Sequence, residues 1–295
     1  MVNRNYNVIY ILATLLVILI IIRVKMNLNN LQNRDNKQDL YQLINDYRKN
    51  DKIIFIVGSP GSGTTLMRTI MDVSPKMNCD HETKLIPNIL YMRMNLIKLL
   101  PSNHKSYETY LRDSDNAFRL FIVKVIEKGD PSYEILCAKD PGTIYHIEYL
   151  AKLFENIRII YMIRDGRGSS LSTMNRENKR MEKSIFHDLI KKWNDVNSKA
   201  YVDCKKIGAD KCLMVKYEDL VTDSEKTIRK VLEFTDIEFS QDFLHHEQAN
   251  DIDFSNDRSK LKINTEKLNS WDGEIDYDKK KLENLEMFKK FGYKI

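Results

Sequence analysis

The feature that most constrains this chain is an apolar run that leads directly into a glycine-rich turn. Residues 52–57 read Lys-Ile-Ile-Phe-Ile-Val, which is apolar without alternation, as is typical of a strand covered on both faces. The turn Gly58–Thr65 follows, and a helical apolar pattern begins at Leu66. Backbone N–H groups converge at such a strand, turn and helix start, and the helix dipole favours negative charge. The segment therefore predicts an anion cradle, with a plain turn as the alternative.

The turn lacks the lysine that an ATP-binding loop needs. The pattern G-x-x-x-x-G-K-[ST] fits from Gly58 to Thr65, except that Thr64 stands at the lysine position. Without that lysine, no side chain of the turn reaches a β- or γ-phosphate. The turn therefore favours a terminal phosphate or sulfate on a short diphosphate-like unit over ATP hydrolysis.

Further apolar runs predict a parallel sheet. Strands are expected at 133–138, 157–163 and 212–216, and helices near 86–100, 117–128, 144–154 and 187–206. Alternating strands and helices predict an α/β fold, a three-layer P-loop-type parallel sheet flanked by helices. Polar residues follow each strand at its carboxyl end, the edge at which open α/β sheets bind ligands.

The first 50 residues form a separate region. Val8 to Ile22 is almost wholly apolar, with Arg4 before it and Arg23 and Lys25 after it. We predict a short tail (1–7), an uncleaved signal-anchor transmembrane helix (8–24), a polar stem (25–50) and one catalytic domain (51–295). A cleaved signal peptide is the main alternative, although no small-x-small site follows the run. The flanking charges are nearly balanced and set no orientation.

The chain is mildly basic, with a formal net charge of +5 over 295 residues. This balance suits anionic ligands or acidic partners. The charges are interspersed and form no stripe of the kind that nucleic acids require, so we expect no nucleic-acid partner.

Seven short motifs, in order along the chain, resemble those of one enzyme family. They are Gly63–Arg68 (GTTLMR), Glu82-Thr83, Cys137–Pro141 (CAKDP), Arg164–Arg167 (RDGR), Lys192–Asn194 (KWN), Tyr217–Leu220 (YEDL) and His245–Glu247 (HHE). Together they are similar to the tyrosylprotein sulfotransferases of the Golgi, from about Lys52 to the C-terminus. The resemblance implies the sulfotransferase fold, a homodimer, and tyrosine-containing, acidic protein or peptide substrates. It also implies a single-pass type II Golgi membrane protein with a lumenal catalytic domain.

The resemblance implies 3′-phosphoadenosine 5′-phosphosulfate (PAPS) as donor and no metal. The phosphosulfate would be held by Gly61, Ser62, Gly63, Thr64 and Thr65, and the 3′-phosphate end by Arg164, Ser172, Arg176 and Tyr217. Ser172 and Arg176 lie four apart on a predicted helix, so both can face one phosphate. The alternative is that Arg164 and Arg167 merely pair with acidic residues. A basic residue among Lys260 and Lys262 is also matched to the donor.

For catalysis, the resemblance matches the general base to Glu82, a carboxylate that can accept the phenolic proton. The adjacent His81 is an alternative base. Lys139 matches a lysine that stabilises charge on the transferring group. The alternative is that Lys139 is a plain lysine at a strand end that pairs with Asp140. Ser255 is matched to a serine near the sulfate.

Three positions depart from the family pattern. Gly61 stands where the family has an arginine, which removes a cation from beside the phosphosulfate and costs about 1.5–3 kcal/mol of binding if nothing replaces it. Two acceptor-reading arginines are replaced by Lys84 and Asn88, which weakens the preference for acidic substrates.

The four cysteines are Cys79, Cys137, Cys204 and Cys212. An even count behind a membrane anchor suits an oxidising lumen, although spacing alone leaves four free thiols as an alternative. The family resemblance implies the pairs Cys79–Cys137 and Cys204–Cys212. The first pair would tie the segment of Glu82 to the strand of Lys139.

The remaining motifs add little chemistry. Adjacent histidines in the HHE run point apart on a helix, unlike the i, i+4 pair of a zinc helix, so we interpret the run as structural. Trp193 and Trp271 are expected in the core. Three functions follow as hypotheses: a protein-tyrosine sulfotransferase, a sulfotransferase for carbohydrate or another hydroxyl acceptor, and an inactive PAPS-binding or kinase-like relative.

Overall fold

The computed structural model describes residues 42, 46–80, 82–99, 103, 105–128, 130–177, 182–248, 263, 265–266, 268–275 and 277–295. The chain divides into two units, residues 1–47 and 48–295, and the second contains the strands and helices that follow. The predicted tail, the signal anchor and most of the stem lie outside the described residues. Within the described ranges, no helix combines the length and the apolar composition needed to cross a bilayer.

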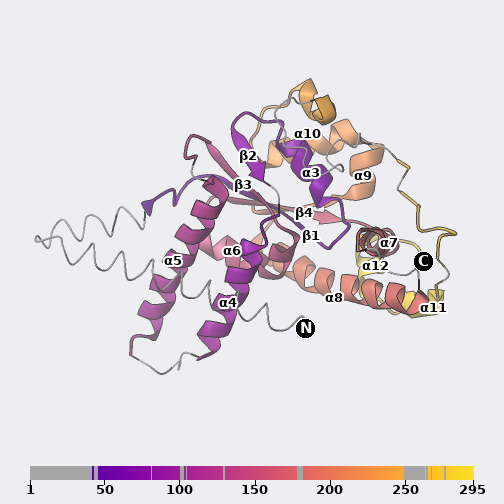
Figure 1. The fold of residues 1–295 in the computed structure, drawn as a ribbon, viewed down its shortest axis with the longest axis horizontal. Helices are drawn as coiled ribbons and strands as arrows, with labels where there is room; N and C mark the ends of the chain where they lie inside the picture. Colours follow the sequence, from indigo (N-terminus) through magenta and orange to yellow (C-terminus); the bar gives the residue numbers. More distant parts are fainter. Residues whose placement is uncertain are drawn as a thin grey trace, which may run out of the picture. The chain divides into compact units, whose positions relative to one another are not determined.

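Strands and helices alternate along the second unit (Figure 1). The strands are β1 (Ile53–Gly58), β2 (Met77–Asp80), β3 (Ile135–Lys139), β4 (Ile157–Ile163) and β5 (Cys212–Lys216). The α-helices are α3 (Thr64–Met71), α4 (Leu85–Leu99), α5 (Tyr107–Glu127), α6 (Ile147–Leu153), α7 (Gly166–Arg176), α8 (Lys183–Ile207), α9 (Tyr217–Thr222), α10 (Ser224–Phe234), α11 (Lys279–Glu283) and α12 (Glu286–Phe291). The 3-10 helices are η1 (Pro141–His146), η2 (Gln241–Leu244) and η3 (His246–Gln248).

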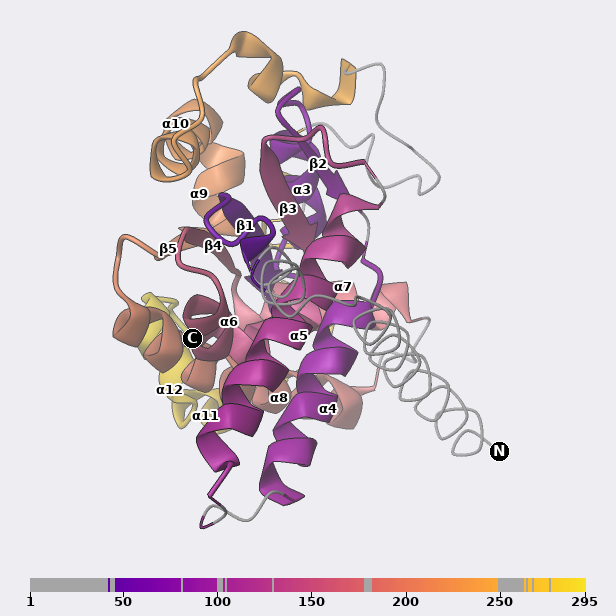
Figure 2. The ribbon, with the colours of Figure 1, turned by 90° about the vertical axis from the view of Figure 1, so that its left-hand side faces the viewer.

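The five described strands form one parallel sheet in the order β2-β3-β1-β4-β5. Figure 2 shows α3, α9 and α10 on one side of the sheet and α6, α8 and α12 on the other. The predicted parallel sheet flanked by helices is therefore confirmed. Because all strands run the same way, the ends of β1, β3, β4 and β5 share one edge, where the predicted polar residues follow.

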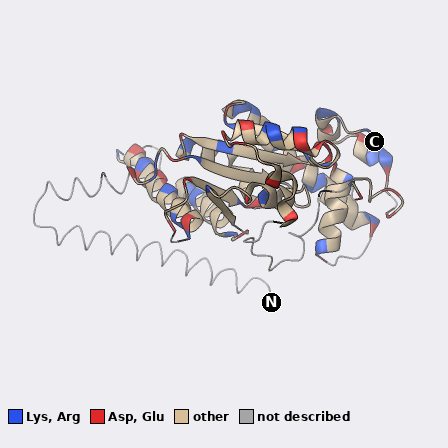
Figure 3. Ribbon diagram, turned by 90° about the horizontal axis from the view of Figure 1, so that it is seen from above, with Lys and Arg blue, Asp and Glu red and all other residues tan. Residues whose placement is uncertain are grey.

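The central strand β1 explains the apolar run that opens the domain. All six of its residues are buried. Ile54 and Ile56 join a core cluster with residues of α3 and α10, whereas Phe55 packs against Phe154 at a ring-centroid distance of 6.1 Å. Both faces of the strand thus contact apolar side chains, which removes the alternation that a half-exposed strand shows. Charged residues of both signs lie on the surrounding helices and loops (Figure 3).

The structure differs from the sequence prediction at β2, at the start of α5 and at Trp271, among other places. The edge strand β2 was not predicted, because Met-Asn-Cys-Asp has no apolar run and its conformation depends on pairing with β3. Helix α5 begins at Tyr107, ten residues before the predicted start, because its first half is mostly polar and contains no buried residue. Trp193 is buried as expected, with 3% of its surface exposed, whereas Trp271 is only partly buried.

Candidate active site

The glycine-rich turn after β1 forms a backbone cradle at the start of α3. Gly61 and Gly63 have φ angles of +82° and +95°, a left-handed conformation that glycine adopts without the steric cost of a Cβ atom. Gly63 is the N-cap of α3 and makes no side-chain capping bond, so no side-chain cap competes with an anion for the first N–H groups of the helix. The buried Ser62 hydroxyl has no hydrogen-bond partner among the described residues. These groups fit the anionic phosphosulfate predicted for the turn.

Residues of α7 and α9 approach this turn too closely for any side chain larger than glycine. A Cβ atom on Gly61 would lie 2.5 Å from the Ser169 carbonyl oxygen and 3.1 Å from the Ser172 Cβ. A Cβ atom on Gly63 would lie 2.6 Å from the Tyr217 ring. Ser172 and Tyr217, both predicted at the donor, therefore lie directly beside the glycines.

Arg164 follows β4 and brings a buried positive charge to the same place. Its Nη1 donates to the Gly61 carbonyl oxygen at 3.1 Å, and its guanidinium lies 4.3 Å from the centre of the Tyr217 ring. Only 4% of Arg164 is exposed. Burial lowers the pKa of Arg164, while nearby Tyr217 and Glu218 act in the opposite direction. The turn, Arg164, Ser172 and Tyr217 thus form one cluster with net positive character.

The two other arginines of this region have different surroundings. Arg167 pairs with both carboxylate oxygens of Asp165 and donates to the Lys294 carbonyl oxygen at 2.6 Å. The alternative prediction, that this arginine pairs with an acidic residue, therefore holds for Arg167. Arg176 lies one turn beyond Ser172 on α7, has 41% of its side chain exposed, and approaches Glu177 at 4.0 Å. Its predicted role at the 3′-phosphate stays a prediction.

The predicted base and cation lie together at the same sheet edge. Lys139 ends β3, Glu82 follows β2, and the Lys139 Nζ lies 3.4 Å from the Glu82 Oε2. Lys139 is 7% exposed, whereas 34% of the Glu82 side chain is exposed. Burial lowers the pKa of the Lys139 ammonium, and the Glu82 carboxylate opposes that effect. A proton acceptor open to solvent thus lies beside a largely buried cation.

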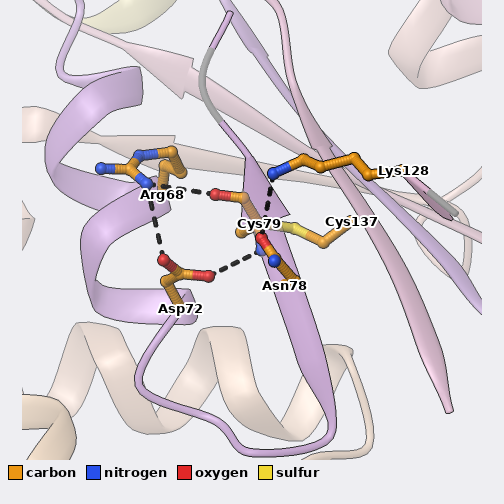
Figure 4. Close-up of a disulfide and its surroundings, with 6 residues drawn as sticks. All are labelled: Arg68, Asp72, Asn78, Cys79, Lys128 and Cys137. Carbon is orange, nitrogen blue, oxygen red and sulfur yellow. Dashed lines mark hydrogen bonds and ion pairs between the residues drawn. A yellow bond between two sulfur atoms is a disulfide. The ribbon is translucent and has the colours of Figure 1, made fainter. Parts of the chain in front are cut away.

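The segment before Glu82 is held to the sheet by a disulfide and a buried arginine (Figure 4). Cys79 and Cys137 face each other in register on β2 and β3 and are bonded, with a Cα–Cα distance of 4.7 Å. Arg68 on α3 donates to the Cys79 carbonyl oxygen at 3.2 Å, and the Cys79 N–H donates to Asp72 at 2.7 Å. Sequence reasoning assigned no role to Arg68 or Asp72, although Arg68 lies within a quoted motif.

The second predicted disulfide is also present. Cys204 near the end of α8 bonds to Cys212 at the start of β5, with a Cα–Cα distance of 5.5 Å. Both implied pairings are therefore confirmed, and the alternative of four free thiols is wrong.

Asp140 fixes the chain on the other side of Glu82. Its Oδ2 accepts the Lys84 N–H at 3.0 Å and its Oδ1 accepts the Gly142 N–H at 3.3 Å. Lys84 has a φ angle of +59°, uncommon for a residue with a side chain. Burial, followed by the nearby Glu82 charge, raises the pKa of Asp140 to about 6. Asn88, the other predicted acceptor residue, donates from its amide to the Lys84 carbonyl oxygen at 2.7 Å.

Several predicted site residues lie outside the described part of the chain. They are His81, Ser255, Lys260 and Lys262. Among the described residues, no cluster of three His, Cys, Asp or Glu side chains has a metal-binding arrangement. His246 of the HHE run is fully buried.

Comparison with known proteins identifies the class. The fold matches the sulfotransferase domain of the Synechococcus PCC 7002 olefin synthase with a TM-score of 0.60 and 18% identity, covering 85% of this chain and 98% of that domain. A sulfotransferase domain from the curacin biosynthetic pathway matches with a TM-score of 0.58 and 17% identity, covering 83% and 99%. The sulfotransferase family profile matches residues 54–241. The fold and this site therefore define a sulfotransferase.

Sequence relatives narrow the class. Protein-tyrosine sulfotransferase 2 of Gallus gallus is 35% identical over 245 residues, which cover 79% of this chain and 66% of that protein. Protein-tyrosine sulfotransferase 1 of Danio rerio is 35% identical, with 79% and 69% covered. The chain belongs to the protein-tyrosine sulfotransferase family. It spans about two thirds of these two relatives, and 51% of the Drosophila melanogaster protein at 33% identity.

Proposed function

We propose that this protein transfers a sulfuryl group from PAPS to the hydroxyl of tyrosine in a protein acceptor. One observation carries the proposal: the Glu82 carboxylate lies 3.4 Å from the Lys139 ammonium. Both groups lie at the sheet edge where β1 leads into the glycine turn. Membership of the protein-tyrosine sulfotransferase family supports this acceptor over a carbohydrate hydroxyl.

The chemistry assigns distinct tasks to the two side chains. The acceptor oxygen forms a bond to sulfur while the bond from sulfur to the bridging phosphate oxygen breaks, leaving 3′-phosphoadenosine 5′-phosphate (PAP). Glu82 accepts the phenolic proton, and its partly exposed position lets an acceptor reach it. The Lys139 ammonium stabilises negative charge on the transferring group and the bridging oxygen, an effect strengthened by its burial.

The donor would be held by the cluster around the turn. Residues 61–65 supply backbone N–H groups and the orphan Ser62 hydroxyl to the phosphosulfate. Arg164 and Ser172 lie beside Gly61 and supply the cation and hydroxyl for the 3′-phosphate end. An arginine fork suits a phosphate through its fixed array of donors.

We also propose an oxidising, lumenal setting for the catalytic domain, which both disulfides support. The type II Golgi anchor and the homodimer remain proposals from the family resemblance, as does the contact of Lys84 and Asn88 with an acidic acceptor.

The decisive experiment measures transfer of labelled sulfur from PAPS by the full chain, produced in an oxidising secretory host. The acceptor is a peptide with one tyrosine among acidic residues, and the control peptide carries phenylalanine instead. We expect label on the tyrosine peptide alone. No label on any tyrosine peptide, with PAP still bound, would contradict the proposed acceptor.

A matched variant tests the assignment of the base. Glu82→Gln keeps the shape of the side chain but cannot accept the proton, so we expect kcat to fall about 10²- to 10⁴-fold. The affinity for PAP, measured by calorimetry, should stay unchanged because Glu82 lies outside the donor cluster. A variant with full activity would assign the proton transfer to another group, such as His81.

A further inference from the structure

A hollow lies along the end strand β5, away from Glu82 and Lys139. β5 ends the sheet and pairs only with β4 among the described strands. A hollow of about 550 Å³ lies along it, lined by residues of β5, α8, α9, α10 and α12. Figure 2 shows α10 on one side of β5 and α12 on the other. We call this hollow the β5 groove.

The β5 groove is strongly basic. Its lining includes five lysines against two aspartates, Asp219 and Asp223, a formal excess of three positive charges: Lys205, Lys216, Lys226, Lys230 and Lys290. Among the described residues, no carboxylate lies within ion-pair distance of Lys205, Lys216 or Lys230. Lys205 and Lys216 instead lie 5.9 Å and 5.2 Å from the ring centres of Tyr201 and Tyr293. Their charges are therefore available to an anionic partner.

We propose that the β5 groove docks an extended, acidic segment of a protein, which adds to the edge of β5. An end strand has one row of backbone N–H and C=O groups without a strand partner, and an extended chain can pair with it. Lysines on α8 and α10, the helices that cover opposite faces of the sheet, place positive charge on both sides of such a segment. Main-chain pairing and charge complementarity together favour an acidic peptide strand over a small anion.

The position of the groove predicts where the acidic segment lies in an acceptor protein, a step that rests on the proposed function. Three strand-to-strand steps separate β3, which ends at Lys139, from β5, which ends at Lys216. At about 4.8 Å a step this is roughly 14 Å, and an extended chain covers about 3.4 Å per residue. The acidic segment should therefore lie at least about four residues from the sulfated tyrosine.

A direct binding measurement tests the groove without any catalysis. A fluorescent acidic peptide without tyrosine is titrated with the full chain and with the charge-reversed variant Lys205→Glu/Lys230→Glu. Both lysines are exposed on helices, so the variant should fold. The control is Lys49→Glu/Lys76→Glu, which makes the same charge change just before the amino ends of β1 and β2, neither of which is next to β5 in the sheet.

We expect Lys205→Glu/Lys230→Glu to weaken peptide binding about tenfold or more relative to that control. A peptide N-methylated at alternate residues should also bind weakly, because it cannot pair along a strand. Equal binding by the two variants, or undiminished binding of the N-methylated peptide, would overturn the proposal. The full chain is also mixed with vesicles that contain acidic lipids. If it binds these vesicles but not the peptide, and Lys205→Glu/Lys230→Glu abolishes vesicle binding, the groove contacts a membrane surface and the proposal is overturned.

Kinetics then test the link to the acceptor. Tyrosine peptides carry the acidic tract about two or about eight residues from the tyrosine. We expect the distant tract alone to lower KM through the groove, with this gain lost in Lys205→Glu/Lys230→Glu and kcat unchanged. A gain that survives in the variant would overturn the docking role. If no tyrosine peptide is sulfated, the proposed function fails, and the binding measurement still decides the groove.

Discussion

Replacing Gly61 tests whether the tight fit of the glycine turn holds the donor site together. Gly61 has a φ angle of +82°, and a Cβ atom there would lie 2.5 Å from a backbone oxygen, that of Ser169. The backbone of α7 has little freedom to move away. Ser169 and Thr173 donate from their hydroxyls to the Pro60 carbonyl oxygen at 2.7 Å and 3.2 Å, and the Trp193 ring packs against Gly166.

The size of the effect follows from three contributions. The left-handed backbone costs a residue with a Cβ about 1–2 kcal/mol, and the overlap with α7 costs about 1–3 kcal/mol. Alanine also lowers the conformational entropy of the unfolded chain, which stabilises the folded state by about 0.4–1 kcal/mol. Gly61→Ala should therefore lower the free energy of unfolding by about 3 kcal/mol, a large part of the ~5–15 kcal/mol typical of a domain.

The chain offers a matched control at Gly273. Its φ angle is +80°, yet no atom lies within 4 Å of a Cβ built there. Gly273→Ala should cost only about 1 kcal/mol, because it carries the backbone strain without the overlap. The difference of about 2 kcal/mol between the two variants isolates the contact with α7.

The assay is urea unfolding of both variants, together with calorimetric titration of PAP. We expect Gly61→Ala, unlike Gly273→Ala, to bind PAP about tenfold more weakly or worse, because the turn must shift to relieve the overlap. Gly61→Arg, which restores the arginine implied by the family resemblance, should weaken binding further. If Gly61→Ala is as stable as Gly273→Ala and binds PAP as tightly as the unchanged protein does, the overlap with α7 does not hold the turn in place.

Two further predictions concern the catalytic edge of the sheet and the disulfides. Asp140 has a pKa of about 6, against an ordinary 3.8. Between these two pH values the folded protein holds more protons than the unfolded chain. The free energy of unfolding therefore falls by up to about 3 kcal/mol as the pH rises from the lower value to the higher. Urea unfolding at several pH values should show a smaller fall in the Asp140→Asn variant. If the variant shows the same dependence of stability on pH as the unchanged protein, the assignment to Asp140 is wrong. For the disulfides, chain entropy predicts a loss of about 4 kcal/mol for Cys137→Ser, which opens a 58-residue separation, and about 2.5 kcal/mol for Cys204→Ser, which opens one of 8. Thermal unfolding should rank the two variants in this order, and Cys137→Ser should also lower kcat because it frees the segment of Glu82.

The predicted strands and the glycine turn were accessible from sequence because each depends on local patterns. The unbroken apolar run of β1 reflects burial on both faces, and the two glycines with positive φ mark the turn. The disulfide pairing came from the family resemblance, since spacing alone left free thiols open. Edge strand β2 was missed because nothing local distinguishes Met-Asn-Cys-Asp from a loop.

The arrangement of the site depends on contacts between distant segments. Glu82 and Lys139 are 57 positions apart in the sequence, and this separation says nothing about the 3.4 Å between their charged atoms. Pairing of β2 with β3, the disulfide between them, and the bond from Arg68 to Cys79 place the two side chains together. The basic groove along β5 likewise gathers lysines from four separate elements.

The amino-acid sequence was sufficient for the class of fold, the glycine turn after β1 and the residue types available for the proposed sulfuryl transfer, because periodicity, glycine placement and short motifs act over a few residues. Other features follow from tertiary packing alone: Gly61 lies against α7, Arg167 pairs with Asp165 while Arg164 contacts the turn, and Asp140 accepts a hydrogen bond from the Lys84 N–H. These choices depend on strand order and packing, which bring together groups that the chain keeps far apart.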